Sequence, residues 1–295
     1  MGAGSGWRRA LADLGGALLP LAARDLVREI DDRIRKVPTR LNEFGFDPWG
    51  LHPDTVRRGI LPVLLLYRYW FRVETFGIER VPAGGVLLVA NHAGQLPFDA
   101  MMIATAMLIE ADPPRLVRGM AEYWVAELPF VSELAARGGA VSGTPETCRE
   151  MLEAGEAVLV FPEGVRGMNK LYRDRYRLQR FGTGFLRLAL QARVPIVPIA
   201  VVGSEEQQPG LANLRGLARA LGMPAFPVTP TFPWLGPLGL LPLPVKYRIY
   251  FGEPMHFEGS PNDEDAVIEA KVAQVREAIE ALFERGLEER KGVFR

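Results

Sequence analysis

The chain has 295 residues, 48% of them hydrophobic and 24% charged, which is ordinary for a globular protein with a sizeable core. Its 35 Lys and Arg residues balance its 35 Asp and Glu residues, so no global basic field favours nucleic acid as a partner. The single cysteine, Cys148, excludes an intramolecular disulfide, and three histidines are too few for a His-rich metal cage. We expect a protein of the reducing cytoplasm with no metal and no resident cofactor.

Residues 1–75 predict amphipathic helices, because apolar residues recur at helical spacing among Arg and Asp. The segment Ile60–Trp70 combines apolar and aromatic residues with Arg, a composition suited to a bilayer interface. A core helix with a charged rim has the same pattern, so both interpretations stay open. Asp13 and the glycines after it interrupt the one stretch that resembles an export signal. No uninterrupted apolar run reaches the roughly 18 residues of a spanning helix.

From residue 85 the pattern changes to short apolar strands that alternate with helices. Strands are predicted at Val86–Ala90, Arg115–Arg118, Ala157–Phe161, Ile196–Val202 and Tyr247–Phe251. Helices are predicted near Ala100–Leu108, 145–154 and Thr183–Ala192, and a long polar one over 262–290. Continuous apolar strands separated by helices are typical of an α/β fold with a mostly parallel sheet flanked by helices. We therefore divide the chain into an N-terminal amphipathic helical region, 1–75, and an α/β domain with a C-terminal helix, 76–295.

Polar residues follow two of the predicted strands, at the sheet edge where ligands bind in open α/β folds. Asn91 and His92 come directly after the first strand, with Asp99 close behind, and the block FPEGVRG includes the end of the third. An imidazole can take a proton from a hydroxyl, and a carboxylate on its other nitrogen holds the tautomer. A guanidinium among glycines, as at Arg166, suits phosphate binding.

These two blocks, in this order and about 70 residues apart, resemble the motifs of the glycerolphosphate acyltransferase family, the lysophospholipid acyltransferases. The resemblance covers residues 81–253, with 127–141 in the place of an intermediate block. It implies an O-acyltransferase in which His92 is the general base and Asp99 orients it. The acceptor hydroxyl would attack a thioester of coenzyme A or acyl carrier protein, without a covalent enzyme intermediate. The acceptor would be positioned by Asn91, Arg137, Glu163, Gly164 and Arg166.

One feature departs from the family pattern. Six residues separate His92 from Asp99, where the family has four. A similar expansion occurs in the monoacylglycerol and diacylglycerol acyltransferase-like branch, so the acceptor stays open between lysophosphatidate, a neutral glyceride and another lysolipid. The alternative is a catalytically inactive lipid-binding or scaffold protein in which the wider loop misplaces His92.

Two segments favour peripheral binding to a membrane. Arg166–Arg180 holds six basic residues against one acid, a composition suited to anionic headgroups. Phe226–Val245 is apolar, but its six prolines exclude a helix. We expect this stretch and Leu61–Phe71 to meet the inner face of the plasma membrane, and the alternative is that both pack on the core.

Overall fold

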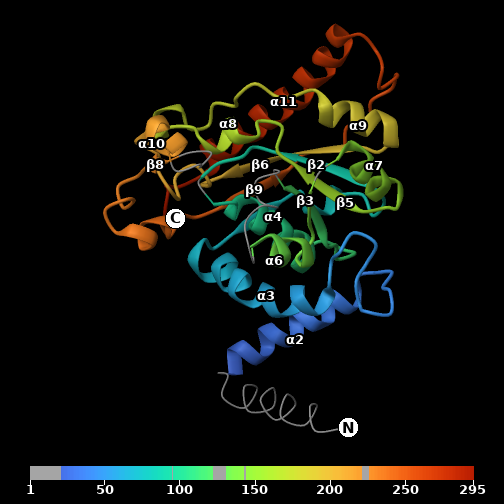
Figure 1. Ribbon diagram of the computed structural model, residues 1–295, viewed down its shortest axis with the longest axis horizontal. Helices are drawn as coiled ribbons and strands as arrows, with labels where there is room; N and C mark the ends of the chain where they lie inside the picture. Colours follow the sequence, from blue (N-terminus) through green and yellow to red (C-terminus); the bar gives the residue numbers. More distant parts are fainter. Residues whose placement is uncertain (1–20, 95, 122–130, 143, 221–225) are drawn as a thin grey trace.

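The computed structural model describes residues 21–94, 96–121, 131–142, 144–220 and 226–295. Its centre is a seven-stranded sheet in the order β1-β9-β6-β2-β5-β3-β4. Figure 1 shows the central strands of this sheet between the helices. All neighbouring strands are parallel except β6 and β9, so the predicted mostly parallel α/β fold is confirmed. The strands are β1 Glu74–Phe76, β2 Val86–Ala90, β3 Val117–Ala121, β4 Ala140–Ser142, β5 Ala157–Val160, β6 Ile196–Val202 and β9 Arg248–Phe251. A separate antiparallel pair joins β7 Ala212–Asn213 to β8 Pro227–Val228.

Helices cover both faces of this sheet (Figure 1). The longer ones are α2 Leu21–Arg35, α3 Pro53–Leu65, α4 Phe98–Ile109, α6 Val131–Arg137, α7 Pro145–Glu153, α9 Gly184–Ala192 and α11 Asp265–Glu289. The shorter ones are η1 Leu66–Trp70, η2 Ile78–Arg80, α8 Val165–Met168, η3 Tyr172–Asp174, α10 Arg215–Ala220 and η4 Gly236–Leu240. In the parts of the chain that are described, no helix is both long enough and apolar enough to cross a membrane.

Strand β2 explains why the core has two halves. Its alternate side chains point to opposite faces, as the two-residue repeat of a strand requires. Leu88 packs into a cluster with α2, α3 and α4, whereas Leu87 and Val89 pack into a second cluster with α7, α9 and α11. All five β2 residues are apolar and buried, as expected for a strand covered on both faces. The strand therefore fixes the start of the loop that follows it, at the carboxyl end of the sheet.

The N-terminal helices share the first of these cores with the sheet. Ile30 of α2, Leu64 of α3 and Phe71 after η1 are buried in the same cluster as Tyr247 beside β9. The boundary that the sequence suggested at 75/76 falls inside β1. Among the exposed side chains of this region are Tyr69 and Trp70, so Leu61–Phe71 is partly core and partly surface. The predicted helix over residues 1–20 lies outside the described residues.

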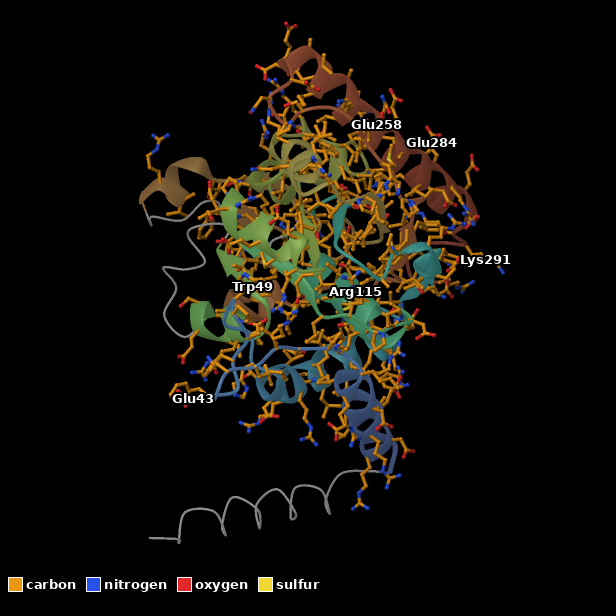
Figure 2. The ribbon with its side chains drawn as sticks, turned by 90° about the vertical axis from the view of Figure 1, so that its right-hand side faces the viewer. Glu43, Trp49, Arg115, Glu258, Glu284 and Lys291 are labelled. Atoms are coloured by element: carbon orange, nitrogen blue, oxygen red, sulfur yellow. The ribbon has the colours of Figure 1, made fainter. Side chains whose placement is uncertain are left out.

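Two predicted elements differ from the observed ones. Arg115 lies before β3 instead of within a strand, and its guanidinium donates to the carbonyls of Pro82, Gly84 and Gly155 at 2.6–2.7 Å. The residue, labelled in Figure 2, is buried. The C-terminal helix α11 is not polar all round, because Ile268, Val275 and other apolar residues at helical spacing are buried against the sheet.

Candidate active site

His92 and Asp99 meet at the carboxyl end of β2. The Nδ1 atom of His92 lies 2.7 Å from Oδ2 of Asp99. The Asp99 side chain is fully buried, and 9% of the His92 side chain is exposed. The other ring nitrogen, Nε2, has no hydrogen-bond partner among the described residues and is not buried. Since the carboxylate holds the proton on Nδ1, Nε2 has the lone pair that a general base needs.

The wider loop between His92 and Asp99 still brings the two side chains together. Asp99 lies in the first turn of α4, where the helix dipole favours a carboxylate. Its Oδ2 also accepts from the backbone N–H of Ala93 at 2.9 Å, and its Oδ1 from that of Ala100 at 2.8 Å. Three donors therefore surround this carboxylate and fix its orientation.

Two residues that the sequence did not single out pack against His92, one on its ring and the other on its backbone. The ring stacks on Phe161, with centroids 4.1 Å apart and planes inclined by 20°. Gly167 of α8 passes so close that an added Cβ would lie 2.9 Å from the backbone oxygen of His92. Both come from the FPEGVRG block, so the signal for them was their place in the second motif.

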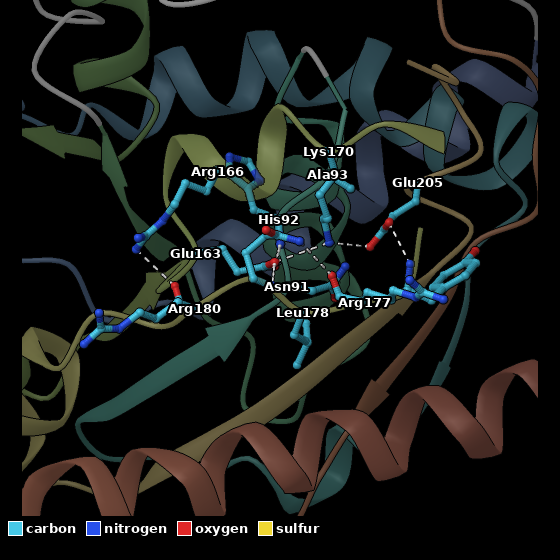
Figure 3. Close-up of polar contacts among 12 residues, drawn as sticks. Asn91, His92, Ala93, Glu163, Arg166, Lys170, Arg177, Leu178, Arg180 and Glu205 are labelled. Atoms are coloured by element: carbon cyan, nitrogen blue, oxygen red, sulfur yellow. Dashed lines mark hydrogen bonds and ion pairs between the residues drawn. The ribbon is translucent and has the colours of Figure 1, made fainter. Parts of the chain in front are cut away.

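Glu163 holds the backbone of His92 in place. Its side chain is fully buried, Oε1 accepts from the His92 backbone N–H at 3.1 Å, and Oε2 accepts from the Gln179 backbone N–H at 2.7 Å. Figure 3 shows Glu163 beside His92. The sequence placed this residue against the acceptor, but here both carboxylate oxygens bind the protein's own backbone.

Asn91 is also part of the framework. It is fully buried; its Oδ1 accepts from the Val201 backbone N–H at 2.8 Å, and its Nδ2 lies 3.5 Å from the Ser204 hydroxyl. The side chain thus ties the end of β2 to the end of β6. In this structure the Asn91 side chain is enclosed by protein atoms and does not face an open space.

Gly164 and Arg166 lie where a ligand can reach them. Gly164 has φ +55°, a left-handed conformation that favours glycine, and it starts the turn into α8. Arg166 is exposed, donates to the Arg180 carbonyl at 3.1 Å, and has no carboxylate partner among the described residues. A cavity of 530 Å³ next to it is lined by residues that include Arg166, Asn169, Arg173, Gln179 and Asn213, and by one acid, Asp174. Its donors suit an anionic group.

The structure does not bring Arg137 to this site. The residue ends α6, where its guanidinium pairs with Glu133 and lies 5.7 Å from the centre of the Phe46 ring. It lies before β4, and Gly139, two residues further on, lies near the carbonyl of Val117 at the start of β3, whereas His92 follows the end of β2. The match to the intermediate block is therefore not supported by the geometry.

The basic stretch Arg166–Arg180 divides into an outer and an inner part. Arg173 and Arg180 have 79% exposed side chains, whereas the Lys170 side chain is only 5% exposed. Lys170 extends inwards to Glu205 and Glu163 (Figure 3). The prediction that all six basic residues form a surface patch is wrong for Lys170, because two buried carboxylates compensate its charge.

Residues 204–208, which follow β6, form a buried polar segment that the sequence did not mark as functional. Burial raises the pKa of the Glu205 carboxyl, an effect that the Lys170 ammonium opposes. Glu206 accepts from the Tyr176 hydroxyl at 2.7 Å and pairs with Arg290 at 2.8 Å. The sequence signal that could have marked this segment was the pair of adjacent acids, Glu205 and Glu206, shortly after an apolar strand.

Other chemistries find no support in the described parts of the chain. No three His, Cys, Asp or Glu side chains there gather closely enough to hold a metal ion. Cys148 is buried in α7 with its sulfur near that of Met120, and burial raises the pKa of its thiol to about 11. A thiol of that kind is a poor nucleophile.

Comparisons with known proteins indicate the family. A family model described as Acyltransferase matches residues 72–202, which include both polar blocks. An uncharacterized protein of Mycobacterium tuberculosis is 43% identical over 260 residues, 86% of this chain and 71% of that protein. The DGAT1/2-independent enzyme synthesizing storage lipids of Gallus gallus is 27% identical over 218 residues, 73% of this chain and 60% of that enzyme.

The fold is also that of a solved structure. The crystal structure of the 1-acyl-sn-glycerophosphate (LPA) acyltransferase PlsC from Thermotoga maritima superimposes with a TM-score of 0.51. The alignment covers 97% of this chain and 90% of that one, at 17% sequence identity. The superposition shows a shared fold, and the matched family segment identifies the chain as an acyltransferase. More narrowly, the chain belongs to the glycerolipid acyltransferase family, which confirms the resemblance noted in the sequence.

Proposed function

We propose that this protein transfers a fatty acyl chain from a thioester of coenzyme A or acyl carrier protein to a hydroxyl of a lysophospholipid or glycerolipid. The observation that carries the proposal is the 2.7 Å contact between His92 and Asp99, beside the turn that presents Gly164 and Arg166. The similarity to an enzyme named for storage-lipid synthesis supports neutral glycerides as acceptors alongside lysophosphatidate.

The proposed reaction needs no covalent intermediate on the protein. Nε2 of His92 takes the proton of the acceptor hydroxyl while that oxygen attacks the thioester carbonyl. A C–O ester bond forms and the C–S bond breaks. The departing thiolate takes this proton from His92 and leaves as a free thiol. Asp99 stabilises the imidazolium during the interval in which the ring is charged.

The test is an acyl-transfer assay of the purified protein. Radiolabelled acyl-coenzyme A is offered with lysophosphatidate, another lysophospholipid, monoacylglycerol and diacylglycerol, and acyl carrier protein is compared as donor. We expect one acceptor class to give an ester product at least tenfold faster than the others. Binding of these lipids without any product would instead favour the inactive scaffold, which the intact His92–Asp99 geometry argues against.

Arg166→Ala separates the two acceptor classes. If the acceptor carries a phosphate, we expect its KM to rise about tenfold to a hundredfold, since a charge-assisted hydrogen bond is worth roughly 1.5–3 kcal/mol. If the acceptor is a neutral glyceride, kcat falls instead, because the residue then acts by positioning. Steady-state kinetics with lysophosphatidate and monoacylglycerol measure both. An unchanged KM and kcat for both acceptors would remove Arg166 from the site.

The same proposal includes peripheral binding to the inner face of the plasma membrane. The proline-rich stretch exposes Trp234, Leu235, Leu238 and Leu241 by 60–73%. It lies beside η1, because the Trp70 indole donates to the Pro242 carbonyl at 3.1 Å. It also lies close to the His92 loop: the Gln207 carbonyl accepts from the Leu243 N–H at 2.7 Å, and the Gln207 amide touches Gly94. Apolar side chains so exposed suit an interface with lipid.

Trp234→Ser with Leu238→Ser is expected to weaken binding to vesicles containing phosphatidylglycerol by about tenfold or more, because two large side chains no longer enter the lipid. Vesicle flotation at low salt measures it, with Val267→Ser, an exposed apolar residue of α11, as the matched control. Salt should weaken binding of the natural protein, since exposed charges are screened over roughly 10 Å at 0.1 M. No binding of the natural protein at low salt would reject this interface, and binding resistant to alkaline carbonate would indicate an integral segment.

A further inference from the structure

Lys170 lies between the carboxylates of Glu163 and Glu205, near the His92 loop (Figure 3). Its Nζ lies 2.7 Å from Oε1 of Glu205 and 3.3 Å from Oε2 of Glu163. All three side chains are at most 5% exposed. Among the described residues, Lys170 is the one cation within ion-pair distance of Glu163. The mechanism proposed above does not use it.

The need for this cation follows from the surroundings of Glu163. A buried carboxylate is stable only if hydrogen bonds and an opposite charge compensate its loss of water. The backbone N–H groups of His92 and Gln179 supply the hydrogen bonds, and Lys170 supplies the charge. Without it, the buried charge of Glu163 would be uncompensated, and the side chain would turn away and release the His92 backbone.

Glu205 holds Lys170 in this place. Its second oxygen accepts from the Tyr176 backbone N–H at 2.8 Å, so the carboxylate cannot follow the lysine outwards. His92, Glu163 and Glu205 follow β2, β5 and β6, which are neighbours in the sheet. Lys170 therefore connects the loops at the carboxyl ends of the three central strands, and the catalytic loop is the middle one.

We propose that Lys170 is a positioning residue for acyl transfer: it holds Glu163 against the backbone of His92 and so fixes the ring where it meets the acceptor, with Glu205 as its anchor. The inference rests on the proposed function. It assigns the innermost basic residue of Arg166–Arg180 to the geometry of the general base and not to lipid headgroups.

Lys170→Met, which keeps the length of the side chain and removes its charge, is expected to lower kcat at least tenfold while the acceptor KM changes less than about threefold. Lys170→Arg should retain more activity than Lys170→Met, because it keeps the charge. If the methionine variant does not fold, Lys170→Gln, which can still donate to one carboxylate, provides the same comparison with Lys170→Arg. Lys271→Met is the matched control, since Lys271 pairs with Asp263 near the start of α11.

A second measurement does not depend on turnover. The chain has three histidines, so the ring signals of His92 can be assigned by NMR through their loss in His92→Ala. We expect these signals to shift in Lys170→Met and to stay in place in Lys271→Met. A rise in KM with unchanged kcat would show that Lys170 binds substrate directly, and unchanged kcat with unshifted His92 signals would also overturn the inference. If the natural protein transfers no acyl group, the proposed function fails; if it transfers and Lys170→Met matches it, only this inference fails.

Discussion

His92→Ala is expected to lower kcat by about 10²–10⁴-fold, the usual contribution of a general base. The variant loses the one ring nitrogen at the site that can accept the acceptor's proton, Nε2, since Nδ1 is bound to Asp99. Glu163 contacts the backbone of residue 92 and not its ring, so the loop keeps this support. Acyl transfer under saturating acceptor measures the loss, and vesicle binding should be unchanged.

His92→Gln is the matched variant, because its amide fills part of the space of the ring beside Phe161 but cannot take a proton. It should be as inactive as His92→Ala. Thermal unfolding of both proteins separates loss of catalysis from loss of fold. A folded His92→Ala protein with turnover near that of the natural protein would contradict the general-base mechanism.

Asp99→Asn should lower kcat on the order of 10²-fold, a smaller loss than that of His92→Ala. Among the described residues, each hydrogen bond of Asp99 is with a donor: Oδ2 faces the His92 ring and the Ala93 N–H, and Oδ1 faces the Ala100 N–H. An asparagine has one oxygen, so its NH₂ group must face at least one of these donors. If that donor is the ring, the imidazole turns to the tautomer whose Nε2 carries the proton, and it can no longer act as a base.

The Asp99→Asn protein should also be less stable, by about 1–3 kcal/mol, because a buried donor is left unpaired. Asp265→Asn, at the exposed start of α11, is the control that should change neither property. Kinetics and urea unfolding check the two effects separately. Full activity of Asp99→Asn would mean that the carboxylate has no part in holding the tautomer.

The strands and the two motifs could be predicted because each depends on residues close together in the chain. The apolar runs Val86–Ala90 and Ile196–Val202 became β2 and β6 with the predicted bounds, since a strand buried on both faces is apolar throughout. The helix predicted over 145–154 became α7, and Thr144 caps it, since its hydroxyl accepts from the Thr147 N–H at 3.2 Å. The spacing of six residues did not prevent Asp99 from reaching His92, because Asp99 lies in the first turn of α4 and the loop spans the extra length.

What the sequence by itself determined was the alternation of strand and helix, the family, and the two polar blocks at strand ends. The tertiary structure decided which charged residues are buried: Lys170 pairs with Glu205, 35 positions away, and Glu163 turns to the His92 backbone, 71 positions away. It also placed Arg137 beside Glu133 and Phe46 and not at His92. It exposed Trp234 and Leu238 while burying Tyr67 and Phe71. Periodicity is a local property of the chain, whereas the burial of a charge is stable only with a partner, and the fold alone brings distant partners together.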